Sequence, residues 1–180
     1  MKLDETDLKD LLNEKKQIIR KTGILEFIDS KLNLQDVGGL STLKKWLDLR
    51  SHCFEKKAKS FGILPPKGLL LTGVPGCGKS LTAKCVSSAW NMPLLRLDMG
   101  KIFQGIVGSS ESNIRLALKT AEAISPCILW IDEIEKGLSG SNGGGGDGGT
   151  STRVFGTLLT WMQEKTSPVF VFATANNING

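Results

Sequence analysis

The amino-acid sequence predicts an α/β fold in which helices flank a parallel β-sheet. Short apolar segments of strand length alternate with longer segments whose apolar residues recur at helical spacing. A glycine-rich loop joins the first buried strand to a helix, and an acidic pair follows the third strand. Such alternation is typical of parallel strands that are joined by right-handed crossovers.

Four apolar segments are predicted to be strands, because each is a short continuous run of the kind that is buried on both faces of a sheet. They are residues 68–72, 94–98, 127–131 and 168–173. Residues 24–30 fit either a further strand or a short helical turn. Residues 137–149 are too rich in glycine to hold regular structure.

Helices are predicted between these strands, where apolar residues recur every three or four positions. Ser41 is expected to cap the helix that precedes the first strand. The apolar residues of that helix are Leu43, Trp46, Leu47 and Phe54. The later helices are predicted at residues 81–90, 111–124 and 152–164.

An N-terminal helical extension and linker is predicted for residues 1–35, ahead of a core formed by residues 36–180. The extension carries apolar residues at helical spacing: Leu8, Leu11, Leu12, Ile18 and Ile19. Gly23 suits the C-terminal end of that helix, since glycine readily adopts the left-handed conformation found there.

The loop at residues 73–80 matches the pattern G-x-x-x-x-G-K-[ST] of phosphate-binding loops. Its glycines let backbone N–H groups face inward, and the helix that follows adds partial positive charge. Lys79 can reach the β- and γ-phosphates of a nucleotide, and Ser80 can hold Mg²⁺. The predicted nucleotide-binding residues here are Gly73, Val74, Pro75, Gly76, Cys77, Gly78, Lys79, Ser80 and Leu81. A chance glycine turn is the alternative, and the flanking strand and helix argue against it.

The acidic pair Asp132-Glu133 follows the apolar run at residues 127–131. The carboxyl end of a parallel strand is where α/β sheets place ligands. Asp132 suits a Mg²⁺ site, and Glu133 suits the orientation and deprotonation of an attacking water. The alternative is that the pair only ends a strand, and the phosphate-binding pattern upstream favours the functional interpretation.

Composition and charge restrict the classes of partner. The chain has 180 residues, of which 40% are hydrophobic, and a net charge of +5 with acidic and basic residues interspersed. The lysine pairs suit solvated helix faces better than a nucleic-acid footprint, so no nucleic-acid partner is expected. No apolar stretch approaches the length of a transmembrane segment.

The cysteines argue against a structural metal site and against a disulfide framework. The four cysteines show no C-x-x-C spacing, and His52 is the only histidine. Cys77 lies inside the glycine loop beside Lys79, where a redox role and a merely tolerated side chain both fit.

From Asp36 onward the sequence resembles an AAA-type ATPase module. The matching segments are residues 36–40 (the opening motif D-V-G-G-L), 73–80 (Walker A), 108–115, 128–133 (Walker B) and 152–159. Asn176 falls at the sensor 1 position of that family.

This resemblance implies that the ligands are ATP and Mg²⁺. It implies that Val37 and Gly38 border the adenine, and that Glu133, Lys79 and Asn176 take part in catalysis. It also implies a homo-oligomeric ring that acts on a protein substrate of unknown identity.

Several stretches are more narrowly similar to the uncharacterised AAA-domain proteins of plastid genomes and cyanobacteria: L-L-R-L-D, C-I-L-W-I-D-E-I-E and F-A-T-A-N-N-I. This similarity implies a plastid-encoded protein of the chloroplast stroma, and otherwise a cytoplasmic one. The N-terminus agrees, because it has no apolar signal core and is too acidic for an organellar transit peptide.

Three features depart from the family pattern. Ile106 and Val107 stand where protein-threading relatives carry an aromatic residue, and an aliphatic pair grips an extended peptide less firmly. Ser109 stands where the family usually has glutamate. The sequence stops at Gly180, so the family's fifth strand, trans-acting arginines and helical lid are expected to be missing.

Two functions remain open on this basis. One is an ATPase ring that uses hydrolysis to remodel a partner, which Glu133 favours. The other is a nucleotide-responsive binding module with little hydrolysis, which the expected loss of the C-terminal part favours. A metabolic kinase is a weaker interpretation, because the sequence has no evident lid for a small substrate.

Overall fold

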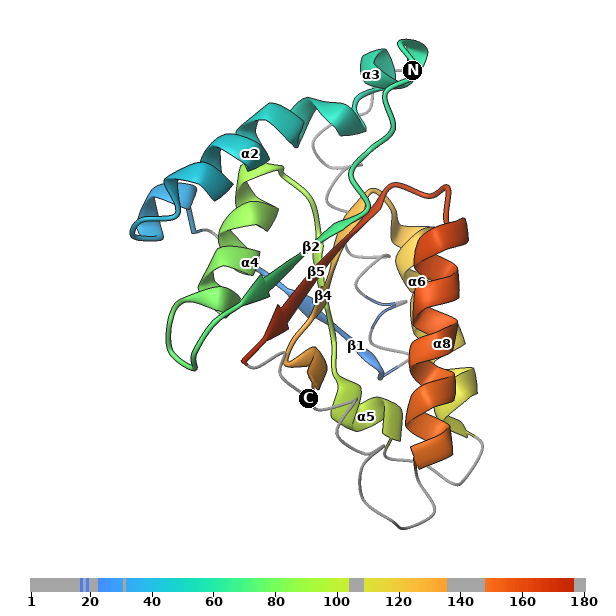
Figure 1. The fold of residues 1–180 in the computed structure, drawn as a ribbon. Helices are drawn as coiled ribbons and strands as arrows, with labels where there is room; N and C mark the ends of the chain where they lie inside the picture. The colour runs from blue at the N-terminus through green and yellow to red at the C-terminus, as the bar shows by residue number, and fades with distance from the viewer. Residues whose placement is uncertain are drawn as a thin grey trace.

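The computed structural model describes residues 17, 19, 23–30, 32–103, 109–135 and 148–176, which form a sheet with helices on both faces (Figure 1). The strands are β1 (Leu25–Ile28), β2 (Gly68–Thr72), β3 (Leu94–Leu97), β4 (Cys127–Ile131) and β5 (Val169–Ala175). The helices are α2 (Ser41–Ser51), α3 (Lys56–Ser60), α4 (Lys79–Ala89), α5 (Met99–Phe103), α6 (Ser109–Ile124) and α8 (Gly148–Glu164), with 3₁₀ turns η1 (Leu34–Asp36) and η2 (His52–Phe54). The predicted α/β fold class is confirmed.

The five strands lie in the order β1-β3-β4-β5-β2, and every neighbouring pair is parallel except β1 with β3. Strands β4 and β5 are buried along their whole length, which explains their continuous apolar sequences. Strand β2 approaches β5 closely, since a Cβ on Gly68 would lie 2.5 Å from the Val171 carbonyl oxygen. Glycine is therefore required at the start of β2.

The helices divide between the two faces of the sheet. Helices α6 and α8 lie side by side over one face, and α2 and α4 lie over the other (Figure 1). On the first face Ile114 and Leu158 belong to one buried cluster with Leu129 of β4. On the second face, Val86 of α4 belongs to a separate buried cluster with Phe170 of β5. Because β4 and β5 contribute to both clusters, they hold the two layers of helices together.

Residues 24–30, for which the sequence allowed either a strand or a short helical turn, contain strand β1. It pairs antiparallel with β3 at one edge, so the sheet is mostly rather than entirely parallel. A strand of four residues is too short for its pattern to be told from a helical turn. The segment lies within the predicted N-terminal extension and yet adds a strand to the sheet, while the domain division at residues 35 and 36 stays a prediction.

The prediction that Ser41 caps a helix is wrong. Helix α2 begins at Ser41, and the cap position belongs to Leu40, whose φ of 53° is left-handed. The Leu40 carbonyl accepts the Lys44 N–H at 2.9 Å, so the backbone closes this turn without a side-chain cap.

Two other helix boundaries differ from those predicted. Phe54 lies in η2 rather than in α2. Helix α8 begins at Gly148, so the last glycines of the predicted irregular segment are helical, because the apolar face further along anchors the helix.

Some predictions fall outside the described residues. They concern the apolar positions Leu8, Leu11 and Leu12, the residues Ile106 and Val107, and most of the segment 137–149. These remain predictions. Among the residues that are described, no helix is long and apolar enough to cross a membrane.

Phe170 gives a test of the packing between β5 and the helices α2 and α4. Its fully buried ring lies 4.8 Å from the Trp90 ring and 6.4 Å from the Trp46 ring, measured between centroids. Phe170→Ala should lower the free energy of unfolding by about 3–5 kcal/mol, because rigid neighbours cannot fill the space. Phe61→Ala, at a side chain that is 75% exposed, should change it by less than about 0.5 kcal/mol. Urea denaturation of both variants tests this, and equal losses would contradict the packing described.

Candidate functional site

The predicted phosphate-binding loop connects the end of β2 to the start of α4. The Gly73 N–H donates to the Ala175 carbonyl at 3.1 Å, which ties the start of the loop to β5. Gly76 and Gly78 have φ values of 81° and 89°, which glycine adopts without strain. Gly78 occupies the cap position of α4, and its carbonyl accepts both the N–H and the hydroxyl of Thr82 at 2.9 Å. The loop therefore ends at a helix N-terminus, where partial positive charge favours an anion.

Lys79 is the first residue of α4, and its side chain folds back into the loop. The residue is only 7% exposed. Its Nζ donates to the carbonyl oxygens of Gly73 (2.5 Å) and Val74 (2.9 Å). A buried ammonium group must be hydrogen-bonded, and here two loop carbonyls serve that purpose. The positive charge is thereby held inside the curve of the loop.

A cavity of about 300 Å³ lies at the loop. The residues that line it are Pro75, Gly76, Gly78, Lys79, Ser80, Leu81, Asp132, Glu133 and Asn176. The sequence assigned each of them to the nucleotide, the metal or catalysis. They come together because β2, β4 and β5 are parallel, so that their carboxyl ends share one edge of the sheet.

The acidic pair at the end of β4 is held by Thr174 of the neighbouring strand β5. The Thr174 hydroxyl donates to Asp132 Oδ1 at 2.7 Å and accepts the Glu133 N–H at 3.1 Å. Glu133 has a φ of 50°, which is uncommon for a residue other than glycine. One fully buried hydroxyl thus orients the Asp132 carboxylate and fixes the left-handed turn that follows it.

Asn176 follows β5 and contacts Glu133 directly. Its Nδ2 donates to Glu133 Oε1 at 3.0 Å, and its backbone N–H donates to Glu135 Oε1, also at 3.0 Å. The amide therefore orients the Glu133 carboxylate, while Glu135 orients the backbone that carries the amide. This arrangement places an oriented carboxylate in the same cavity as Lys79 and Ser80.

Comparison with known proteins identifies the family. Residues 69–180 match the family described as "ATPase family associated with various cellular activities (AAA)". The chain belongs to the AAA family. The glycine loop, the acidic pair and Asn176 all lie within the matched residues, whereas Val37 and Gly38 precede them.

Several relatives resemble the AAA chain over most of its length. It is 54% identical over 169 residues to the "Uncharacterized AAA domain-containing protein ycf46" of Guillardia theta, which covers 94% of this chain and 33% of that protein. The ycf46 protein of Pyropia yezoensis is 56% identical over 177 residues, covering 98% of this chain and 36% of that protein. The "ATPase family protein 2 homolog" of Caenorhabditis elegans is 36% identical over 176 residues, or 92% of this chain and 24% of that protein.

The chain thus spans about a third of the length of the ycf46 proteins that it matches. The similarity to those proteins supports the plastid origin that the sequence resemblance implied.

The donor groups of the cavity fit a magnesium ion. The Ser80 hydroxyl and the Asp132 carboxylate belong to residues that line the same space, and Mg²⁺ prefers such oxygen ligands. Asp132 Oδ1 accepts the Thr174 hydroxyl, whereas Oδ2 lies 3.7 Å from an Arg96 guanidinium nitrogen. A bound triphosphate would supply further oxygen ligands, as in other phosphate-loop proteins.

Some residues predicted for the nucleotide do not line this cavity. Gly73 and Val74 contribute carbonyls to Lys79 instead, and Cys77 is exposed with its Sγ 3.9 Å from Lys79 Nζ. Val37 is buried and its carbonyl accepts Lys44 Nζ at 2.6 Å, and Gly38 is exposed. The role of Val37 and Gly38 at the adenine stays a prediction.

Three residues next to the acidic pair were missed by sequence reasoning: Arg96, Thr174 and Glu135. Arg96 and Thr174 carried a signal, since each is a polar residue in an otherwise apolar strand. Glu135 carried none, because its bond to Asn176 joins two segments that are distant in the sequence. Its Oε2 is buried and has no hydrogen-bond partner among the described residues.

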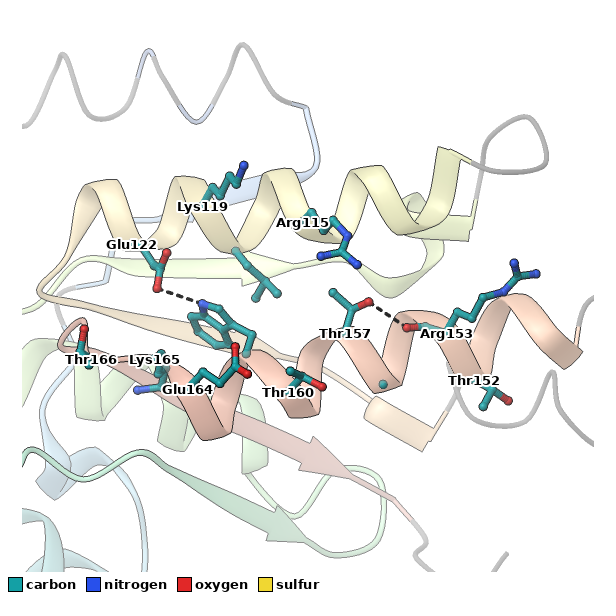
Figure 2. A pocket seen from close by; sticks show the side chains of 13 residues that line it. Arg115, Lys119, Glu122, Thr152, Arg153, Thr157, Thr160, Glu164, Lys165 and Thr166 are labelled. Carbon is teal, nitrogen blue, oxygen red and sulfur yellow. Dashed lines mark hydrogen bonds between the residues drawn. The ribbon is translucent and has the colours of Figure 1, made fainter.

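A larger cavity of about 790 Å³ lies between α6 and α8 and shares no lining residue with the first (Figure 2). Glu122 of α6 accepts the Trp161 indole N–H and the Ser167 hydroxyl, both at 3.0 Å. Burial lowers the pKa of Lys165, whose ammonium lies 5.7 Å from the Trp161 ring centroid. None of the predicted catalytic residues lines this cavity, and Glu122 serves to join the two helices.

Thr174→Val should destabilise the fold, because it removes the buried hydroxyl that bonds both the Glu133 N–H and the Asp132 carboxylate. We expect a loss of about 1–3 kcal/mol in the free energy of unfolding, and a near-native value for Thr174→Ser. Thr120→Val is the matched control, since that hydroxyl bonds the Leu116 carbonyl of its own helix at 2.8 Å. Chemical denaturation measures all three variants. A loss at Thr174 no larger than the loss at Thr120 would contradict the role described.

Proposed function

We propose that this AAA chain binds Mg·ATP in the cavity at the glycine loop and hydrolyses the nucleotide. The observation that carries the proposal is the convergence of the loop, the acidic pair and Asn176 on one cavity. Ser80 and Asp132 would hold the metal, which neutralises charge on the phosphates when it is bound. Inward-facing N–H groups of the loop and the N-terminus of α4 would hold the phosphate oxygens.

Lys79 would contribute its charge to the β- and γ-phosphates. In the structure its ammonium bonds two neutral carbonyl oxygens of the loop. Phosphate oxygens are stronger acceptors for an ammonium group, because they carry negative charge and carbonyl oxygens do not. Exchange of a carbonyl for a phosphate oxygen therefore favours nucleotide binding without exposing the lysine to water.

Glu133 would act as the general base that orients and deprotonates the attacking water. Its carboxylate is held by the Asn176 amide at Oε1, so the side chain has a defined direction in the cavity. A general base must be positioned before its pKa matters, and this hydrogen bond supplies the position. Asn176 would thus act on catalysis through Glu133.

The family and the ycf46 relatives support a proposal for the wider role. We propose that the full-length protein forms a homo-oligomeric ring and uses hydrolysis to remodel a protein partner in the plastid stroma. Val37 and Gly38 would border the adenine. No nucleic-acid partner is proposed, because acidic and basic residues are interspersed in the sequence.

Lys79→Ala should weaken nucleotide binding. It removes a charge-assisted contact to the phosphates that is worth roughly 1.5–3 kcal/mol. Lys84→Ala on the same helix is the control, since Lys84 does not line the cavity. Titration of a fluorescent ATP analogue against the three proteins measures the dissociation constants. Equal affinities would rule out the loop as the phosphate site.

Glu133→Gln should separate binding from hydrolysis. Glutamine keeps an oxygen that can accept the Asn176 amide but cannot accept a proton from water. Nucleotide binding should persist while steady-state turnover falls by a factor of about 10²–10⁴. Glu55→Gln, at an exposed side chain, should leave turnover unchanged. If the wild-type protein binds ATP but turns over no faster than Glu133→Gln, it is a nucleotide-responsive binding module rather than an ATPase.

A further inference from the structure

Arg96 of β3 lies between two carboxylates at the edge of the candidate site. One guanidinium nitrogen lies 3.7 Å from Glu26 Oε2 of β1, and another lies 3.7 Å from Asp132 Oδ2. The guanidinium carbon lies 5.3 Å from the Trp130 ring centroid, within the range of a cation–π contact. The sheet register explains this placement, because Glu26 pairs with Arg96 and Arg96 pairs with Trp130 across adjacent strands.

These contacts act through charge rather than through directed hydrogen bonds. Both separations exceed the range of a hydrogen bond but allow an ion pair. The Arg96 Nε is buried and has no hydrogen-bond partner among the residues that the structure describes. The positive charge of Arg96 is therefore shared between Glu26 on one side and Asp132 on the other.

The two oxygens of Asp132 have different neighbours. Oδ1 accepts a 2.7 Å hydrogen bond from Thr174, which orients the carboxylate. Oδ2 faces the Arg96 guanidinium. Loss of Arg96 would consequently leave Asp132 oriented and would remove only a neighbouring positive charge.

We propose that Arg96 acts through Asp132, by its charge, to set how tightly that carboxylate holds Mg²⁺, and that Glu26 opposes its effect. This inference rests on the proposed function, in which Asp132 binds the metal. Arg96 competes with the ion for the negative charge of Asp132, because two cations near one carboxylate repel each other. Glu26 draws the guanidinium toward β1 and so leaves more of the Asp132 charge to the metal.

Substitutions of Arg96 and Glu26, which form an ion pair, should have opposite effects. Arg96→Gln should strengthen the contribution of Mg²⁺ to nucleotide binding by about three- to fivefold. Glu26→Gln should weaken it by about twofold. The effects are modest because the Arg96 and Glu26 side chains are 38% and 55% exposed, so water screens them. The double variant should behave like Arg96→Gln, since Glu26 acts only through Arg96.

The experiment measures the affinity of a fluorescent, non-hydrolysable ATP analogue for the protein at its natural length, with Mg²⁺ and with EDTA. The dissociation constant in EDTA divided by the dissociation constant with Mg²⁺ gives the contribution of the metal. This ratio does not depend on turnover. Arg96→Lys keeps the charge and should give a ratio close to that of the wild type. Glu111→Gln and Arg115→Gln are matched controls, because that ion pair of 2.7 Å does not line the cavity and should leave the ratio unchanged.

The outcomes separate this inference from the proposed function. A wild-type protein that binds no nucleotide, or binds it equally well without Mg²⁺, overturns both. A wild-type protein that shows the Mg²⁺ effect, with an unchanged or smaller ratio in Arg96→Gln, overturns the inference alone. A reduced ratio for Glu26→Gln that persists in the double variant overturns the role of Arg96 as the intermediary. A general loss of folding would weaken binding alike with Mg²⁺ and with EDTA, so it cannot produce the opposite changes in the ratio that are expected.

Discussion

The position of β5 between β4 and β2 is the constraint on which the site depends. Both neighbours pair with it in parallel, so the ends of all three strands lie at one edge of the sheet. The Ala175 carbonyl receives the first N–H of the glycine loop, and the Thr174 hydroxyl bonds both members of the acidic pair. A shift of β5 by one residue would turn Thr174 to the other face and break these contacts together.

Every charged group at the candidate site already has a partner in the protein. Lys79 bonds two carbonyls, Asp132 contacts Thr174 and Arg96, and Asn176 holds Glu133. Such partners are needed because a buried charge without one is costly. Under the proposed function, a phosphate would replace the loop carbonyls at Lys79, and a metal ion would replace the guanidinium at Asp132. Each exchange substitutes one favourable interaction for another, so a ligand can bind without unfolding the site.

Local patterns in the sequence were sufficient for the parallel core and for most residues of the cavity, whereas Asn176 was assigned only through the resemblance to the AAA family. Continuous apolar runs identified β2 to β5, and the glycine pattern with its flanking strand and helix identified the loop. The contacts of Thr174 and Arg96 could not be predicted, since they depend on which strands are neighbours and on how their registers match. The error at Ser41 has the opposite origin: a local rule for helix caps was overridden by the left-handed backbone of Leu40. Short elements such as β1 carry too few residues for their pattern to decide between strand and helix.

Strand β1 and the groove between α6 and α8 differ in how they can influence the cavity at the glycine loop. The groove between α6 and α8 shares no lining residue with the cavity. These two helices pack on the sheet through the buried cluster that contains Ile114, Leu129 and Leu158. Strand β1 is farther along the sheet, yet Glu26 is connected by a single side chain, Arg96, to Asp132, the carboxylate proposed to hold the metal. Electrostatic influence requires only that charges be close and partly shielded from water, whereas packing influence requires that whole elements move. A short edge strand can therefore affect the candidate metal site more directly than the large helices that cover the sheet.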